Sequence, residues 1–136
     1  MDQIRVVDYF YAESADRPGE AARVLSALHD AGVNLFVFTG FPRGRRAQLD
    51  FVPDDAASFR AAARKAGLKL KGPKKAFLIA GEDRPGAMLD VMRKLGDAKV
   101  NVTSTQAVCG GAGRFGAIVW VKARDVKRAA KALGAG

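Results

Sequence analysis

The sequence predicts an α+β protein made of two tandem ferredoxin-like modules, each with its elements in the order βαββαβ. The main observation is a repeat. The tetrapeptide Asp-Arg-Pro-Gly occurs at residues 16–19 and again 67 residues later, at 83–86. Two apolar patterns typical of amphipathic helices recur at the same offset. A chain of 136 residues with 49% hydrophobic residues is long and apolar enough for two small cores.

Each copy of the tetrapeptide is preceded by a strand-like segment and followed by an amphipathic helix. We expect the strands at 5–12 and 76–80, which are rich in β-branched, aromatic and aliphatic residues. The helical spacing i, i+3, i+4, i+7 places four apolar residues on one face. These are Ala21, Val24, Leu25 and Leu28 in the first repeat, and Met88, Val91, Met92 and Leu95 in the second.

A hairpin and a second helix complete each repeat. We expect its strands at 33–39 and 45–52 in the first repeat, and at 100–108 and 115–122 in the second. The glycine-rich stretch 110–113 joins two strands and lacks the Gly-Lys-Ser/Thr ending of a phosphate loop, so it is predicted to be a hairpin loop. The second helices carry matching stripes, which are Phe59, Ala62, Ala63 and Ala66, then Val126, Ala129, Ala130 and Leu133.

The two repeats differ at their ends. The first has a segment at 68–71 for a closing strand, whereas the second ends before the equivalent position. Its sheet would keep a bare edge, and we expect residues 4–7 to cover it. The predicted modules are 1–72 and 73–136, with Gly-Pro-Lys-Lys at 72–75 as the linker.

Each residue of Asp-Arg-Pro-Gly has a physical role where a strand gives way to a helix. We expect Asp16 and Asp83 to N-cap the helices, and the prolines to fit the first turn. Gly19 and Gly86 would lie in that turn, where alanine is more favourable by about 1 kcal/mol. Either a neighbouring element packs closely on this backbone, or the anionic group of a small molecule binds its free N–H groups.

These residues resemble the ACT-domain family, small βαββαβ regulatory modules of amino-acid metabolism. The resemblance covers nearly the whole chain, twice. It rests on Asp-Arg-Pro-Gly, on the helical stripe, and on Ala-Gly-Val-Asn-Leu and Ala-Lys-Val-Asn-Val before the second strand of each module. It implies that two modules pair into a continuous sheet, and that an amino-acid effector binds where the loop before the first helix faces the partner module.

Carried over residue by residue, the resemblance implies a ligand site made of Asp16, Arg17, Pro18, Gly19, Asn34, Asp83, Arg84, Pro85, Gly86 and Asn101. With pseudo-two-fold pairing, Asp16 shares a site with Asn101, and Asp83 with Asn34. Carboxylate and amide oxygens would accept hydrogen bonds from an ammonium group. Some effector-binding members carry a histidine two residues before the aspartate, where this chain has Ser14 and Gly81. The structural alternative is that Asp caps a helix and Asn ends a turn.

The predicted function is regulatory binding of an amino acid, without catalysis. The output would pass through a regulated partner protein or through a homodimer. No acid pair, no nucleophile beside a base and no metal-ligand spacing stands out, and Cys109 and His29 are single. We therefore predict no cofactor and no metal. Without an apolar run of membrane-spanning length or signal-peptide features, we expect a cytoplasmic protein with no membrane contact.

The main alternative is a nucleic-acid-binding protein on the same fold. The formal net charge is +9, with basic residues concentrated at 43–46 and 69–75. The remaining positive charge is spread along the chain, which favours a solvated surface over a nucleic-acid footprint. A small enzyme comes last, because it needs a constellation of reactive groups that the sequence does not show.

Overall fold

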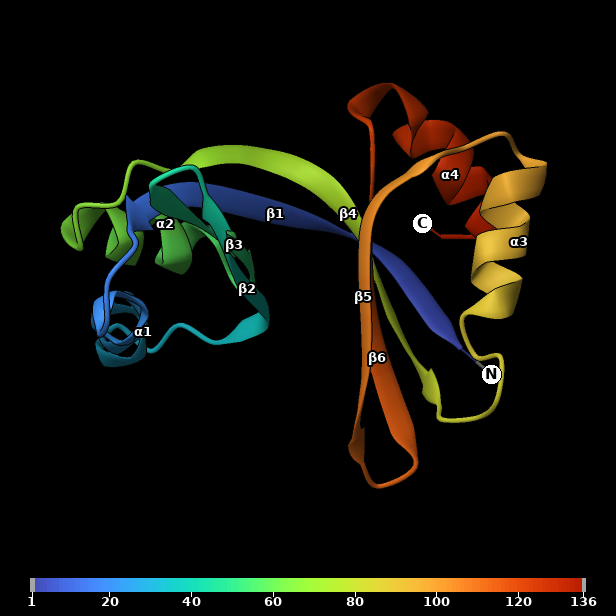
Figure 1. Cartoon of the computed structure of the whole chain (residues 1–136), viewed down its shortest axis with the longest axis horizontal. Helices are drawn as coiled ribbons and strands as arrows, with labels where there is room; N and C mark the ends of the chain where they lie inside the picture. Colours follow the sequence, from blue (N-terminus) through green and yellow to red (C-terminus); the bar gives the residue numbers. More distant parts are fainter. Residues whose placement is uncertain (1, 136) are drawn as a thin grey trace. The chain divides into compact units, whose positions relative to one another are not determined.

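The structure is a computed structural model that describes residues 2–135 (Figure 1). Its elements follow the predicted order in both repeats. The first repeat contains β1 (Gln3–Ala15), α1 (Glu20–Asp30), β2 (Leu35–Arg43), β3 (Arg46–Pro53) and α2 (Ala56–Lys65). The second contains β4 (Lys71–Glu82), α3 (Leu89–Asp97), β5 (Val102–Gly111), β6 (Arg114–Val121), a 3-10 turn (Ala123–Asp125) and α4 (Val126–Leu133).

The strands follow one another in the order β2-β3-β1-β4-β6-β5. The β1–β3, β2–β3, β4–β6 and β5–β6 pairs are antiparallel, as in a ferredoxin-like module. No strand follows α4 in the described residues. The predicted fold class, two ferredoxin-like modules of which the second lacks a closing strand of its own, is therefore confirmed.

The chain forms two compact units. The first unit consists of residues 8–74, and the second of residues 2–7 together with 75–135. The predicted modules were 1–72 and 73–136. The main difference is that residues 2–7 belong to the second unit and not to the first. Because β1 and β4 each run from one unit into the other, the units do not follow the sequence repeat.

Residues 2–7 complete the sheet of the second unit. Ile4 and Val6 pack against its core, and the strand order places β1 beside β4. Asp2 accepts two hydrogen bonds from Arg84 in the same unit. The prediction that the start of the chain covers the bare edge is confirmed.

The predicted linker at 72–75 is wrong, because these residues lie inside β4. The closing strand of the first repeat and the opening strand of the second are one continuous strand. The linker prediction took Gly72 as a loop signal, but a glycine is needed at this position for a reason of packing. A Cβ at Gly72 would lie 2.8 Å from the carbonyl oxygen of Tyr9, so the close backbone of β1 requires glycine there.

Each unit has its own core, formed where two helices cover one face of its strands. The rings of Phe10 and Phe51 lie 5.2 and 5.1 Å from that of Phe59 on α2, and all three are buried. Burying each such ring stabilises the fold by about 1.5–3 kcal/mol. The predicted stripes reach these cores through Val24, Leu28, Phe59, Ala62 and Ala63 in the first unit, and Val91, Leu95, Ala129 and Leu133 in the second.

Candidate functional site

The Asp-Arg-Pro-Gly loops join β1 to α1 and β4 to α3, but their aspartates do not cap the helices. The N-cap residues are Gly19 and Met88, and neither helix has a side-chain cap. Both Asp16 and Asp83 are exposed. In each loop a turn precedes the helix, with Glu20 N donating to Arg17 O at 3.3 Å in the first. This turn delays the start of the helix beyond the reach of the aspartate, and the capping prediction is wrong.

Both repeated glycines are explained by their backbone angles. Gly19 has φ 87° and Gly86 has φ 74°, in the left-handed region that glycine enters without strain. A Cβ at Gly19 would meet nothing within 4 Å, and one at Gly86 would make only an ordinary contact, 3.8 Å from Leu89 Cβ. The expectation that a neighbouring element packs closely on this backbone is therefore not met, whereas binding of a ligand's anionic group to its N–H groups stays a prediction.

The first loop has an internal charge network centred on Glu20. Its Oε1 accepts hydrogen bonds from Ser14 Oγ at 3.0 Å and from Arg23 at 2.8 and 3.2 Å. The bonds from Arg23, and then the one from Ser14, lower the pKa of Glu20. Arg17 lies 3.6 Å from Glu20 Oε2, and 70% of its side chain is exposed. Arg17 is therefore the accessible cation of this loop.

The second loop is held differently. Arg84 donates to Oδ1 and Oδ2 of Asp2, both at 3.1 Å, and to the carbonyl oxygen of Glu82 at 3.0 Å. These side-chain hydrogen bonds lower the pKa of Asp2. Asp83 N donates to Gly113 O at 2.9 Å, which attaches the loop to the β5–β6 hairpin. The two copies of Asp-Arg-Pro-Gly thus have different surroundings.

Position 81 shows why the second loop carries no histidine at the expected place. A Cβ at Gly81 would overlap the carboxylate of Asp2 and the ring of Phe115. The equivalent residue of the first loop, Ser14, has room for a side chain and uses it to bind Glu20. Positions 14 and 81 therefore differ in their local surroundings.

A cavity of about 560 Å³ lies beside the second loop, within the second unit. Its polar lining comes from the loop, from α3 and from Asp2, and its apolar lining includes Val91 and Leu133. The charged groups are three carboxylates and two cations, namely Asp2, Glu82, Asp90, Arg84 and Lys94. Such a lining can hold a small molecule that carries both charges.

A second cleft, of about 470 Å³, lies in the first unit where α1 leads into β2. It is mostly apolar, and it includes the predicted residue Asn34 with Leu25 and Leu35. Asn34 is exposed, and its backbone carbonyl oxygen accepts a hydrogen bond from Asp54 N at 3.0 Å. Asn101 is also exposed. The pairings of Asp16 with Asn101 and of Asp83 with Asn34 stay predictions.

The basic stretches of the nucleic-acid alternative make internal contacts. Arg43 donates to Gln48 at 2.7 Å, and Arg46 lies 3.6 Å from Glu13. Lys71 and Lys74 lie over the ring of Tyr11, at 5.9 and 5.1 Å from its centroid. Each of these four basic side chains therefore already has a partner within the first unit.

Cys109 and His29 are both exposed, and no group of three or more His, Cys, Asp or Glu is arranged to hold a metal ion within residues 2–135. Within the same range no helix has the length and apolarity to cross a membrane.

Sequence reasoning missed several charged residues that surround the loops, Glu82 and Arg23 among them. Glu20 had a signal, because it follows the first tetrapeptide directly, yet its role depends on Ser14 and Arg23. Asp90 and Lys94 lie on the polar side of a predicted helix, where charge is normal. Asp2 had no signal at all, since its contact with Arg84 joins residues 82 positions apart.

Comparison with solved structures finds similar folds at low sequence identity. Protein BT0572 from Bacteroides thetaiotaomicron has a TM-score of 0.83 at 13% identity, covering 96% of this chain and 88% of that one. The regulatory subunit of aspartate kinase from Thermus thermophilus, in its ligand-free form, has a TM-score of 0.65 at 18% identity, covering 98% and 94%. The aspartokinase alpha and beta subunits give 0.64 at 14% identity, covering 97% and 93%.

The sequence matches no protein-family model and no curated protein. The likeness to the aspartate kinase regulatory subunit is therefore one of fold. It extends over nearly the full length of both chains, so it includes both modules. We conclude that this chain shares the two-module fold of the aspartate kinase regulatory subunit.

Proposed function

We propose that this protein is a non-catalytic regulatory protein that binds an amino acid at its Asp-Arg-Pro-Gly loops, with the second loop as the stronger site. The observation that carries the proposal is the cavity of about 560 Å³ beside that loop, which lies within the usual size range of small-molecule sites. The fold shared with an aspartate kinase regulatory subunit supports a regulatory role.

The charges of this cavity suit a zwitterion. Arg84 and Lys94 would hold the ligand carboxylate, and Glu82 and Asp90 its ammonium group, through charge-assisted hydrogen bonds. Arg84 can serve both Asp2 and a ligand, because a guanidinium group has five N–H donors. The apolar wall at Val91 and Leu133 would contact the ligand side chain.

The first loop is the weaker candidate, because its charges already bind one another. Arg23 occupies the position equivalent to Asp90, and its guanidinium is bound to Glu20. Arg17 and the open backbone at Gly19 remain accessible. A ligand there would meet a cation but fewer acceptors for its ammonium group.

We further propose that the regulatory output passes through a homodimer or a partner protein at the edge strand β5. This strand ends the sheet order, and residues 103–111 are all exposed. Val108 is 72% exposed, which is unusual for a large apolar residue in a strand. Uncovered edges of this kind are where strands from a second chain add to a sheet.

Thermal unfolding in the presence of each of the twenty amino acids, in large excess, tests amino-acid binding. A ligand at a hundredfold its dissociation constant should add about 2.7 kcal/mol to the free energy of unfolding. We expect one or a few amino acids to raise the unfolding temperature. The doubly substituted D90N/K94Q, which keeps the net charge, should lose the effect. The control D97N/R93Q, on the same helix but outside the cavity lining, should keep it.

Two outcomes would contradict the proposal. One is that no amino acid stabilises the wild type. The other is that D90N/K94Q and D97N/R93Q respond equally, because the ligand would then bind elsewhere. Stabilisation by a DNA duplex that disappears steeply with added salt would instead favour the nucleic-acid alternative.

A further inference from the structure

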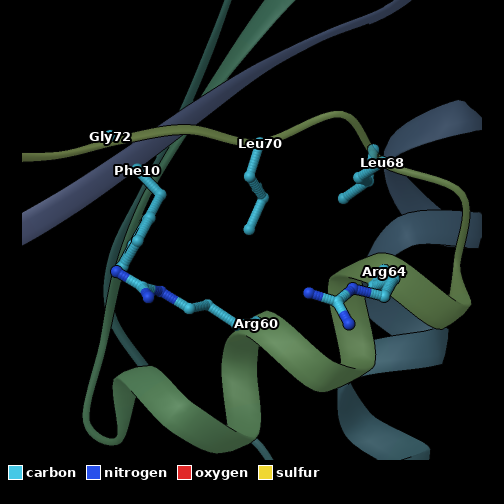
Figure 2. A pocket seen from close by; sticks show the side chains of 6 residues that line it. All are labelled: Phe10, Arg60, Arg64, Leu68, Leu70 and Gly72. Atoms are coloured by element: carbon cyan, nitrogen blue, oxygen red, sulfur yellow. The ribbon is translucent and has the colours of Figure 1, made fainter.

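The first unit contains a separate pocket of about 280 Å³, between α2 and the segment that leads into β4 (Figure 2). It shares no residue with the clefts beside the Asp-Arg-Pro-Gly loop and Asn34. Its lining residues are Phe10, Arg60, Arg64, Leu68, Leu70 and Gly72.

Two guanidinium groups border this pocket. Arg60 and Arg64 are four residues apart on α2, so they lie one above the other on the same face of the helix. Figure 2 shows the Arg60 side chain extending from α2 toward Phe10, and the Arg64 side chain leaving the next turn of the helix on the same side. The guanidinium carbon of Arg60 lies 5.1 Å from the ring centroid of Phe10. Within residues 2–135 neither arginine forms an ion pair with a carboxylate.

Both arginines are exposed, so their mutual repulsion is weak, and a bound anion would relieve it. Like charges at i and i+4 on a helix repel each other. The helix dipole favours Arg64, which lies in the last turn of α2, but it does not explain Arg60 in the middle of the helix. An anion bound between the two guanidinium groups would turn the repulsion into two charge-assisted contacts.

The other side chains of the lining are apolar. Leu68 and Leu70 pack on the core of the first unit, and in Figure 2 the side chain of Leu70 points from the segment before β4 toward α2. Phe10 closes the floor with 1% of its surface exposed. Gly72 contributes bare backbone, because the carbonyl oxygen of Tyr9 leaves no room for a Cβ. The ligand portion that contacts this wall must therefore be apolar.

We propose that this pocket binds a small organic anion, in which a carboxylate or phosphate group is attached to a short apolar body. The head group lies between Arg60 and Arg64, and the apolar body lies against Leu68, Leu70 and Phe10. The volume lies just below the usual range of small-molecule sites, which limits the apolar body of the ligand to about one ring or a short alkyl chain.

Calorimetric titration and ¹H–¹⁵N correlation spectra of the full chain test the proposal with four probes. Phenyl phosphate and phenylacetate carry both parts, inorganic phosphate only the head group, and benzyl alcohol only the apolar body. At least one of the first two should bind saturably and shift the amide signals of residues 60–72. Which one binds more tightly identifies the head group. Inorganic phosphate and benzyl alcohol should each bind at least about tenfold more weakly.

Matched variants separate the pocket from general positive charge. R60Q/R64Q should weaken binding of the preferred probe by about tenfold or more, whereas R93Q/R124Q, which removes the same charge from the second unit, should leave it unchanged. Circular dichroism checks that both variants fold. The proposal is overturned if neither organic anion binds up to about 10 mM. It is also overturned if inorganic phosphate binds equally well, or if both variants weaken binding equally, because the attraction would then be diffuse.

Discussion

The guanidinium group of Arg84 donates a hydrogen bond to each carboxylate oxygen of Asp2, both at 3.1 Å, across 82 positions of sequence. Seventeen per cent of the Asp2 side chain is exposed, so the pair is partly shielded from water. The contact fixes the start of β1 to the second Asp-Arg-Pro-Gly loop. It therefore links the segment that completes the sheet of the second unit to the loop where we propose that an amino acid binds.

The Asp2–Arg84 pair should make stability depend on pH in acid. The pKa of Asp2 is lowered by Arg84, so the folded protein binds a proton there less readily than the unfolded chain. The stabilisation is present above the ordinary value of 3.8, and it is lost as the pH falls through the lower pKa of the folded state. Asp2→Asn should lower the unfolding temperature at pH 7 and flatten its pH dependence below pH 4. Calorimetry between pH 2 and 7 measures both.

Asp97→Asn is the matched control for Asp2→Asn, because Asp97 is an exposed carboxylate in the second unit. It should leave the unfolding temperature nearly unchanged. Hydrogen exchange of the amides of residues 3–7 adds a local readout, and it should accelerate in Asp2→Asn alone. Equal exchange in the two variants would show that the pair does not hold the segment.

The repeated glycines are required for their backbone angle, and substitution tests this directly. Gly19→Ala forces a side chain into the left-handed region at φ 87°, which should destabilise the protein by about 1–2 kcal/mol. Gly96→Ala should do the opposite, by about 0.5–1 kcal/mol, because Gly96 lies within α3 with open space around its Cα. Urea unfolding of both variants measures the difference. Stabilisation by Gly19→Ala would show that the left-handed backbone conformation at position 19 is not required for the fold.

Gly81→Ala should release the start of the chain by steric overlap. The new methyl group would occupy the space of the Asp2 carboxylate and of the buried Phe115 ring. Overpacking of this kind destabilises by about 1–3 kcal/mol. Hydrogen exchange should accelerate over residues 3–7, while the core of the first unit, measured at Phe59, stays protected. Ser14→Ala, at the equivalent place in the first loop, should leave residues 3–7 unaffected.

Self-association through β5 should depend on its exposed apolar face. Val108→Lys places a charge at a position that is 72% exposed, and it should weaken dimerisation by about tenfold or more. Phe41→Lys makes the same kind of change on β2, the opposite edge strand, where Phe41 is 41% exposed. Sedimentation velocity compares them with the wild type. If only Phe41→Lys dissociated the dimer, the interface would lie at β2 and not at β5. If the wild type were monomeric, the homodimer proposal would be wrong.

Much of the fold could be predicted because its signals are local and duplicated. Helical stripes such as Val24 with Leu28, and Val91 with Leu95, reach the cores as expected, since periodicity is a property of neighbouring residues. The linker at 72–75 failed because glycine and proline were taken as loop signals. The structure instead uses Gly72 to let the backbone of β1 approach.

The candidate site was harder to predict because it depends on contacts between distant residues. The tetrapeptide Asp-Arg-Pro-Gly indicated where the loops lie. It did not indicate that Glu20 would pair with Arg23 beside the first loop, or Arg84 with Asp2 beside the second. Asp16 and Asp83 were expected to be caps. The only aspartate that caps a helix through its side chain in residues 2–135 is Asp55, which accepts from Ala57 N at 3.1 Å. It lies outside the repeated tetrapeptide.

The sharing of β1 and β4 between units has a consequence for biosynthesis. Residues 2–7 are made before α4, yet both belong to the same unit. At 5–20 residues per second, about 6–24 seconds separate the synthesis of these two segments. During that time Ile4 and Val6 lack the core on which they pack, while residues 8–74 can already fold. The nascent chain therefore carries an exposed apolar segment that a chaperone could hold until α4 has been made.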